Sequence, residues 1–308
     1  MNRVGVSPRT GGRILVDALL AQGVDIAFGV PGESYLAAMD GLYEAGNRLR
    51  FITCRHEAGA ANMAEAYGKL TGRPGVCFVS RGPGACHAAI GLHTAFQDST
   101  PMVVLVGQVS RAFADREALQ EVDYRRLFAP LAKWVGQIED AARIPELVSR
   151  AFHLAASGRP GPVVLAIPED MQEDTAAVAD VGPFRTVLPH PGAADMAQLA
   201  DRLARAQYPL MIVGGGGWSP AAAADIAHFA QAYGLPVAAS FRCQDIVDND
   251  LAVYVGELGA ATDPALAQRA KKADLLIVGG ARLGEMTTQS YTLFTPPKAH
   301  AEAAKAEA

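Results

Sequence analysis

The sequence predicts an α/β protein built from two parallel-sheet, three-layer domains. Short apolar runs alternate with helical patterns along nearly the whole chain. The apolar runs lack the polar alternation of a half-exposed strand, which indicates strands covered by helices on both faces. A proline-rich stretch divides this alternation into two parts, and 308 residues are enough for about two domains.

In the first part, apolar runs predict strands at residues 25–30, 49–54, 75–80, 102–106 and 163–167. The patterns between them predict helices at residues 13–22, 33–45, 58–70, 85–96 and 142–156. Residues 107–140 mix polar, aromatic and charged side chains, so we expect a long connection with short helices there. Connections of this kind often line a site.

Residues 168–192 interrupt the pattern, because prolines and polar residues replace the apolar runs. We therefore expect a first domain at residues 1–175, a linker at 176–192, a second domain at 193–295 and an Ala-rich tail at 296–308. The second domain has predicted strands at 209–213, 235–238 and 274–278, and predicted helices at 220–233 and 264–271.

Composition excludes several classes of function. The net charge of −5 and the absence of a Lys/Arg run argue against nucleic acid as a partner. No apolar stretch approaches the roughly 20 residues of a membrane span, and the N-terminus lacks the apolar core of a secretory signal. The four cysteines show no metal-binding spacing, as expected for free thiols in a reducing compartment. We therefore expect a cytoplasmic protein.

Turns rich in glycine and proline follow three of the predicted strands, at residues 29–32, 81–84 and 107–108. Glu57 follows a fourth strand, at the start of a helix rich in small residues. Taken singly, such turns merely end strands. The carboxyl ends of parallel strands meet at one edge, where open sheets bind ligands, so together they predict a crevice with a carboxylate in it.

These motifs resemble those of thiamine diphosphate (ThDP) enzymes. Residues 11–170 look like the pyrimidine-binding domain of acetohydroxyacid (acetolactate) synthases and related ThDP carboligases and decarboxylases, and residues 193–295 look like their Rossmann-like central domain. The resemblance rests on residues 28–32 (FGVPG), 55–57 (RHE), 63–67 (MAEAY), 80–85 (SRGPGA), 98–101 (DSTP), 107–109 (GQV), 120–123 (QEVD) and 133–134 (KW).

The resemblance implies a site. Glu57 would be the catalytic acid, which hydrogen-bonds the N1′ atom of the aminopyrimidine ring. The other residues expected near the cofactor are Pro31, Gly32, Gly82, Pro83, His87 and Gln108, and those near the substrate are Gln120 and Lys133. We expect no metal ligand in this chain. His56 is expected to pack beside the acid, and Glu65 to lie at the surface or in an interface.

His87 departs from the synthase pattern, which usually has Thr-Asn where Cys86 and His87 stand here. It could tune substrate choice or proton transfer, or act only as a polar filler, and the exact 2-oxo acid stays open.

The resemblance also implies a third domain, which holds the diphosphate and Mg²⁺ through a Gly-Asp-Gly motif. The sequence contains no Gly-Asp dipeptide. We therefore expect a fragment, a frameshifted product or one half of a split enzyme. Its expected partners are a 2-oxo acid and either further copies, as a dimer or tetramer, or a complementing diphosphate-binding domain.

Several functions remain open at this point. The first is an acetolactate synthase-like decarboxylase and carboligase that uses ThDP. A related alternative is another ThDP-dependent 2-oxo acid decarboxylase. A non-catalytic assembly module would keep the same surfaces without turnover. FAD or NAD binding is the third, because a glycine run at residues 214–217 follows a strand; it fails the dinucleotide motif, since Ser219 stands at the third glycine. Arg242 is the residue that would test FAD binding.

Overall fold

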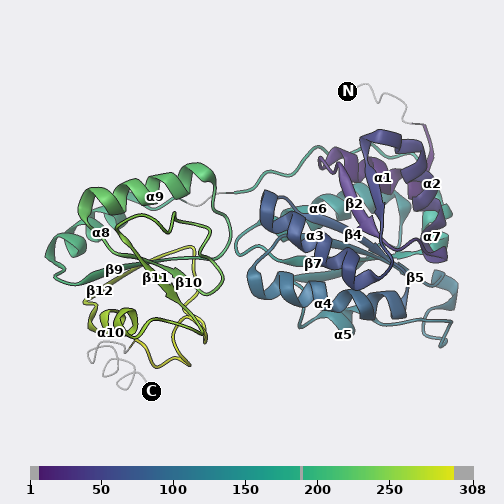
Figure 1. The fold of residues 1–308 in the computed structure, drawn as a ribbon. Coiled ribbons are helices and arrows are strands. Elements are labelled where there is room, and N and C mark those ends of the chain that lie inside the picture. Colours follow the sequence, from purple (N-terminus) through teal and green to yellow (C-terminus); the bar gives the residue numbers. More distant parts are fainter. Residues whose placement is uncertain (1–6, 188–189, 295–308) are drawn as a thin grey trace, which may run out of the picture. The chain divides into compact units, whose positions relative to one another are not determined.

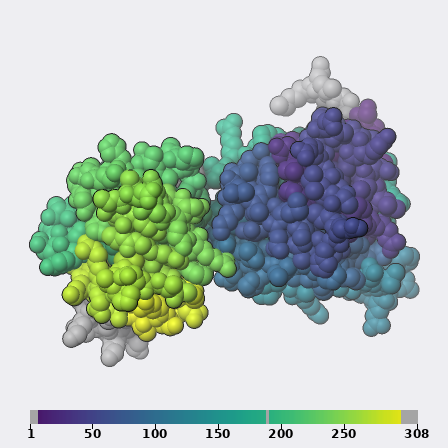
Figure 2. All heavy atoms as spheres, viewed as in Figure 1, coloured from purple at the N-terminus to yellow at the C-terminus, as the bar shows by residue number. Residues whose placement is uncertain are grey.

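The computed structural model describes residues 7–187 and 190–294. The chain forms two compact units, Met1–Leu188 and Pro189–Ala308, each with its own parallel sheet (Figure 1). Figure 2 shows the heavy atoms of both units, coloured from purple to teal in the first and from green to yellow in the second. The expected α/β class with two parallel sheets is therefore confirmed.

The first unit is built on a six-stranded sheet with the order β3-β2-β4-β5-β7-β6. All neighbouring strands in it run parallel. Its strands are β2 (Ile26–Gly29), β3 (Arg50–Thr53), β4 (Gly75–Val79), β5 (Met102–Gln108), β6 (Trp134–Gln137) and β7 (Pro162–Pro168). Its helices are α1 (Gly11–Ala21), α2 (Leu36–Ala45), α3 (Glu57–Thr71), α4 (Gly82–Asp98), α5 (Tyr124–Phe128), α6 (Ile144–Ala156) and α7 (Glu169–Glu173).

Helices cover both faces of this sheet, as the unbroken apolar runs predict. In β4, the side chains of Val76 and Phe78 pack with α1, α2 and α6 on one face. Cys77 and Val79 pack with α3, α4 and α5 on the other face. Successive strand residues point to opposite faces, so a strand covered on both sides must be apolar at every position.

One strand of the six-stranded sheet was not predicted. Residues 107–140 were expected to connect without a strand, but they contain β6 as well as α5. Strand β6 pairs only with β7 and lies at the edge of the sheet. It is short and only partly buried, so its sequence carries a weak apolar signal. The expected strands and helices elsewhere in this unit are confirmed within a few residues of their predicted ends.

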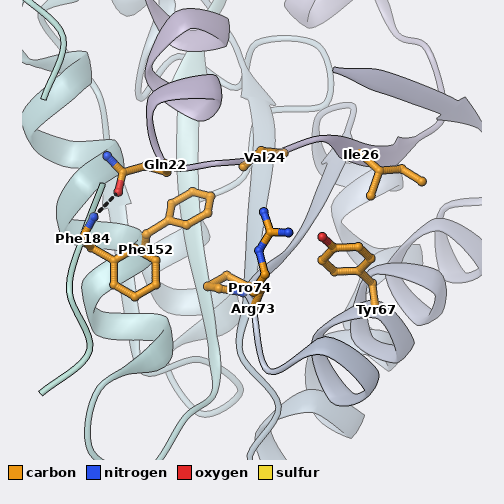
Figure 3. A pocket seen from close by; sticks show the side chains of 8 residues that line it. All are labelled: Gln22, Val24, Ile26, Tyr67, Arg73, Pro74, Phe152 and Phe184. Carbon is orange, nitrogen blue, oxygen red and sulfur yellow. Dashed lines mark hydrogen bonds between the residues drawn. The ribbon is translucent and has the colours of Figure 1, made fainter. Parts of the chain in front are cut away.

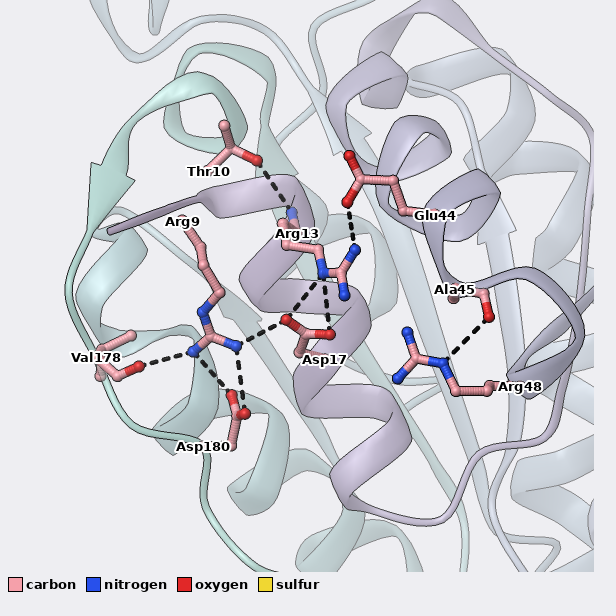
Figure 4. A network of polar contacts seen from close by, with 9 residues as sticks. All are labelled: Arg9, Thr10, Arg13, Asp17, Glu44, Ala45, Arg48, Val178 and Asp180. Atoms are coloured by element: carbon pink, nitrogen blue, oxygen red, sulfur yellow. Dashed lines mark hydrogen bonds and ion pairs between the residues drawn. The ribbon is translucent and has the colours of Figure 1, made fainter. Parts of the chain in front are cut away.

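A small antiparallel pair closes the first unit. Strand β1 (Arg9–Thr10) pairs with β8 (Thr175–Ala176), so the start of the unit lies beside residues that follow its last large strand. Arg9 donates hydrogen bonds to Asp17 of α1, to Asp180 and to the backbone oxygen of Val178 (Figure 4). We call residues 175–184 the closing segment.

The closing segment also packs on the body of the unit. The Phe184 ring lies 6.1 Å from the Phe152 ring of α6, and the Phe184 amide donates to the side-chain oxygen of Gln22. Residues 177–187 have no regular secondary structure. The domain boundaries proposed from the sequence stay a prediction, and the expected tail at residues 296–308 lies outside the described residues.

The second unit has a four-stranded parallel sheet with the order β11-β10-β9-β12. Its strands are β9 (Pro209–Val213), β10 (Val237–Ser240), β11 (Tyr254–Leu258) and β12 (Leu275–Gly279), and its helices are α8 (Ala193–Arg205), α9 (Pro220–Tyr233) and α10 (Pro264–Lys272). Across residues 7–187 and 190–294, no helix has the length and apolar character needed to cross a bilayer.

Candidate functional site

The candidate site lies at the carboxyl edge of the six-stranded sheet. Pro31 and Gly32 lie in the turn after β2, and Gly82 and Pro83 are the first two residues of α4, which follows β4. Glu57 is the first residue of α3, the helix that follows β3, and Gln108 is the last residue of β5. The parallel order β3-β2-β4-β5 therefore brings these residues to one edge, where the sequence predicts a crevice.

Glu57 is the first residue of α3, and the backbone around it is held by a cap. His56 is the N-cap residue, and its Nδ1 accepts a hydrogen bond of 3.1 Å from the amide of Ala58. The first backbone N–H groups of a helix have no acceptor within the helix, and this bond supplies one of them with an acceptor, as a Ser or Asp cap would. It assigns the proton of a neutral His56 ring to Nε2.

His87 of α4 binds the carboxylate directly. Its Nδ1 lies 2.9 Å from Glu57 Oε2, and the rings of His56 and His87 are 4.4 Å apart with a tilt of 30°. The Glu57 side chain is 16% exposed and the His87 side chain 52% exposed. The carboxylate is thus mostly shielded, while the imidazole beside it faces solvent.

Glycines allow the close approach of these elements. A Cβ on Gly84 would lie 3.4 Å from Glu57 Oε1, so the bare glycine leaves space beside that oxygen. A Cβ on Gly32 would come within 2.9 Å of the Ser80 side chain, and one on Gly82 within 2.9 Å of the Gln120 backbone oxygen. The glycine turns therefore let the loops after β2 and β4 reach the edge without blocking it.

Gln108 and Gln120 help to build the neighbouring loop. Gln108 is 7% exposed, and its side-chain amide donates to the backbone oxygen of Val122 and accepts from the amide of Val109. Gln120 has a positive φ of 63°, and its backbone oxygen accepts from the Gly82 amide. Gln120 also lines an open hollow of about 440 Å³ formed by residues 115–123. Contacts of either side chain with a cofactor or substrate stay a prediction.

Arg81 is a residue at this edge for which the sequence reasoning assigned no role. It is 8% exposed, and its guanidinium pairs with Glu169 of α7, which also accepts from Ser110. The pair links the loops after β4, β5 and β7 beneath the crevice. The available signal was an arginine two residues after the end of the apolar strand β4, which a buried ion pair would explain.

The structure does not bring Lys133 to this edge. Lys133 directly precedes β6, so it lies at the amino edge of the parallel sheet, opposite the edge that carries Glu57. Its ammonium group donates to the backbone oxygens of Leu154 and Ser157 at the end of α6. Burial, together with Arg159, lowers the pKa of Lys133. These contacts support a cap on α6, and the predicted substrate contact has no counterpart among them.

Glu65 differs from its expected surface position. It is 9% exposed on α3, and its carboxylate accepts a hydrogen bond of 3.0 Å from the Thr100 hydroxyl. The expectation was wrong because the partner that makes burial tolerable lies 35 residues away in sequence.

A small enclosed cavity of about 30 Å³ lies at the other edge of the same sheet (Figure 3). It is lined by residues at the start of β2, residues before β2 and β4, and three aromatic side chains: Gln22, Val24, Ile26, Tyr67, Arg73, Pro74, Phe152 and Phe184. This volume suits about one water molecule. The cavity therefore has no part in the site around Glu57.

In the second unit, the glycine run forms a tight turn between β9 and α9. Gly215 and Gly217 have φ values of 72° and 88°, and Ser219 caps α9 by accepting from the Ala222 amide. The Arg242 guanidinium lies 5.3 Å from the Phe241 ring. A role for this turn or for Arg242 in FAD binding stays a prediction.

Comparisons with known proteins identify the same two regions. The family model described as "Thiamine pyrophosphate enzyme, N-terminal TPP binding domain" matches residues 9–127. The model described as "Thiamine pyrophosphate enzyme, central domain" matches residues 196–307.

Among curated proteins, the chain is similar to large subunits of acetolactate synthases. It is 36% identical to the isozyme 2 large subunit of Escherichia coli K12, over 93% of this chain and 52% of that protein. It is 36% identical to the large subunit of Parasynechococcus marenigrum, over 94% of this chain and 49% of that protein. A probable large subunit of Methanocaldococcus jannaschii is 32% identical, over 93% of this chain and 49% of that protein. The chain thus spans about half the length of the relatives it matches.

Proposed function

The chain belongs to the thiamine pyrophosphate enzyme family, and we propose that it supplies the aminopyrimidine side of a ThDP site in an acetolactate synthase-like 2-oxo acid decarboxylase and carboligase. The observation that carries the proposal is the position of Glu57. Its carboxylate stands at the carboxyl edge of the sheet, at the first residue of α3, and is mostly shielded from water.

The residues at this edge fit the ring-nitrogen end of an aminopyrimidine. Gly84 presents no side chain beside Glu57 Oε1, while Oε2 is bound by His87. A carboxyl group next to a ring nitrogen can share a proton with it through a hydrogen bond. Gly32 and Gly82 would border the ring, because neither presents a side chain to the crevice.

Bound ThDP supplies the electron sink for decarboxylation of a 2-oxo acid. The part of this chain in that chemistry is to hold and move a proton at Glu57. His87 fixes the orientation of the carboxylate through its bond to Oε2, and the His56 cap fixes the start of α3. The diphosphate, its Mg²⁺ and the acceptor substrate would be held by a complementing domain or a further copy.

Hydrogen exchange at C2 of ThDP tests this proposal. The chain is mixed with a separately expressed diphosphate-binding domain, and the loss of the C2 proton signal in D₂O is followed by NMR. Glu57→Gln should slow the exchange by about 10²–10⁴-fold, the range of a general acid or base. Asp40→Asn, at an exposed position of α2, is the matched control and should leave the rate unchanged.

Exchange at the wild-type rate in Glu57→Gln would remove Glu57 from the proposed chemistry. Binding of ThDP with exchange that is slow in every variant, wild type included, would support the non-catalytic assembly module instead.

A further inference from the structure

We propose that His56, Glu57 and His87 form a binding site for a divalent transition-metal ion such as Zn²⁺, and that an ion there competes with the thiamine cofactor for Glu57. The competition rests on the proposed function, whereas the binding of the ion does not. The expectation of no metal ligand in this chain came from the missing Gly-Asp-Gly motif, whereas this site depends on His87, which lies 30 residues from Glu57 in sequence.

The side chains offer a suitable set of ligand atoms. One ligand atom from each residue lies within 4.8 Å of the other two, and the Glu57–His87 pair is already at 2.9 Å. Two imidazoles and one carboxylate are donors that Zn²⁺ and its neighbours in the periodic table prefer. Bond lengths of about 2.0–2.1 Å place ligands roughly 3.3 Å apart around a tetrahedral ion.

Rotation of the side chains is enough to bring the ligand atoms from within 4.8 Å of one another to the spacing that a bound ion needs. His56 and His87 are both exposed, so their rings are free of tight packing on the outer side. The backbones that carry them are held firmly, because α3 and α4 pack against each other at Ala61 and Gly91. Both helix starts thus present their ligands to the same point.

Binding has one identifiable cost. A neutral imidazole that binds a metal through one nitrogen carries its proton on the other. His56 Nδ1 now accepts the Ala58 amide hydrogen bond, so His56 must release that bond whichever nitrogen binds the ion. One hydrogen bond at the helix start is exchanged for a metal–nitrogen bond.

An ion at this point would take the Glu57 oxygen atoms. A carboxylate that ligates a metal cannot at the same time hold a proton against a ring nitrogen. The family resemblance implies Asn at position 87, whereas this chain has His, which is a stronger metal ligand. We infer that the substitution creates the site.

Metal titration of the full chain, without an added histidine tag, tests the binding. Co²⁺ is followed by visible absorption and Zn²⁺ by calorimetry. We expect one ion per chain, and at least about tenfold weaker binding in His87→Asn and in His56→Asn, because even partners that only support a metal ligand contribute about 10–100-fold to affinity. Asn at position 56 keeps a helix-capping side chain, so that variant should stay folded.

His93→Asn and Cys86→Ser are the matched controls. His93 is exposed on the same helix as His87 but outside the cluster, and Cys86 is the exposed thiol next to His87. Both should bind Zn²⁺ like the wild type. Equal binding in His87→Asn, loss only in Cys86→Ser, or no stoichiometric binding by the wild type would each overturn the proposal. Circular dichroism of every variant separates loss of a ligand from loss of the fold.

Competition is measured as the apparent affinity for ThDP, in the presence of the diphosphate-binding domain, with and without Zn²⁺. Zn²⁺ should weaken the binding of ThDP to the wild type and have a much smaller effect on His87→Asn. If Zn²⁺ binds and the affinity for ThDP is unchanged, the competition is refuted. If Zn²⁺ fails to bind while Glu57→Gln still slows C2 exchange, the metal site fails and the proposed function stands.

Discussion

Replacement of Gly91 by alanine should push α3 and α4 apart and loosen the site that they carry. A Cβ at position 91 would lie 2.5 Å from the Ala61 Cβ and 2.8 Å from its backbone carbonyl carbon. Carbon atoms in favourable contact are about 3.5–4.0 Å apart, so the helices must separate by roughly 1 Å or more. Backbone atoms cannot rotate out of the way, which places the cost of overpacking near the upper end of about 1–3 kcal/mol.

The gain in helix propensity from Gly to Ala offsets about 1 kcal/mol of this cost. The net expectation for Gly91→Ala is therefore a loss of about 2 kcal/mol in the free energy of unfolding, measured by urea denaturation. Gly59→Ala is the matched control, because Gly59 lies in α3 with no atom near its Cβ position. It should raise the stability by about 0.5–1 kcal/mol.

The same separation should weaken the Glu57–His87 contact, since the two residues sit on the two helices. The Nδ1–Oε2 distance of 2.9 Å has little room to grow before it leaves hydrogen-bond range. Zn²⁺ affinity should therefore fall in Gly91→Ala and stay unchanged in Gly59→Ala. If Gly91→Ala is as stable as Gly59→Ala, the close packing of α3 on α4 does not control this edge.

Two further predictions concern charged groups away from the site. Asp17→Asn removes the charge that pairs with Arg9 and Arg13 beside the closing segment, and should cost about 1–2 kcal/mol in urea unfolding; an unchanged midpoint would mean that water replaces these partners without loss. The pKa of Asp274 is lowered from 3.8, chiefly because its carboxylate accepts a hydrogen bond from the Gln207 amide. The ionised Asp274 carboxylate therefore stabilises the folded state above about pH 4, and this stabilisation is lost as the pH falls through the pKa of Asp274 in the folded state. The difference in thermal midpoint between wild type and Asp274→Asn should accordingly be present at pH 7 and shrink below pH 4, and an equal difference at both pH values would contradict this account.

The sequence predicts most of the large elements because the sheet of the first unit is buried on both faces. Strand β5 is apolar from Met102 to Val106, and nothing in that run competes with a strand. The edge strands β6 and β11 and the pair β1–β8 were missed for a physical reason. An edge strand needs few apolar residues, and a two-residue strand has no periodicity, so their formation depends on partners far along the chain.

The candidate site also has a part that the sequence predicts and a part that it does not. The shared edge of Glu57 and the glycine turns follows from parallel topology alone, which a sequence can reveal. The contact of His56 with His87 depends on how α3 and α4 pack, and that packing is set by Ala61 against Gly91 in three dimensions. No local pattern carries such information.

The closing segment has a consequence for the order of events during synthesis. Arg9 pairs with Ala176, so β1 leaves the ribosome well before the strand with which it pairs. Until then the Arg9 guanidinium has water in place of Asp180 and the Val178 backbone oxygen. The central strands pair with strands that are nearer in sequence, so closing the loops between them costs less entropy. The six-stranded sheet can therefore assemble first. Pairing of β1 with β8 would then be the last step in the folding of the first unit, because it requires residues 175–184 to have left the ribosome.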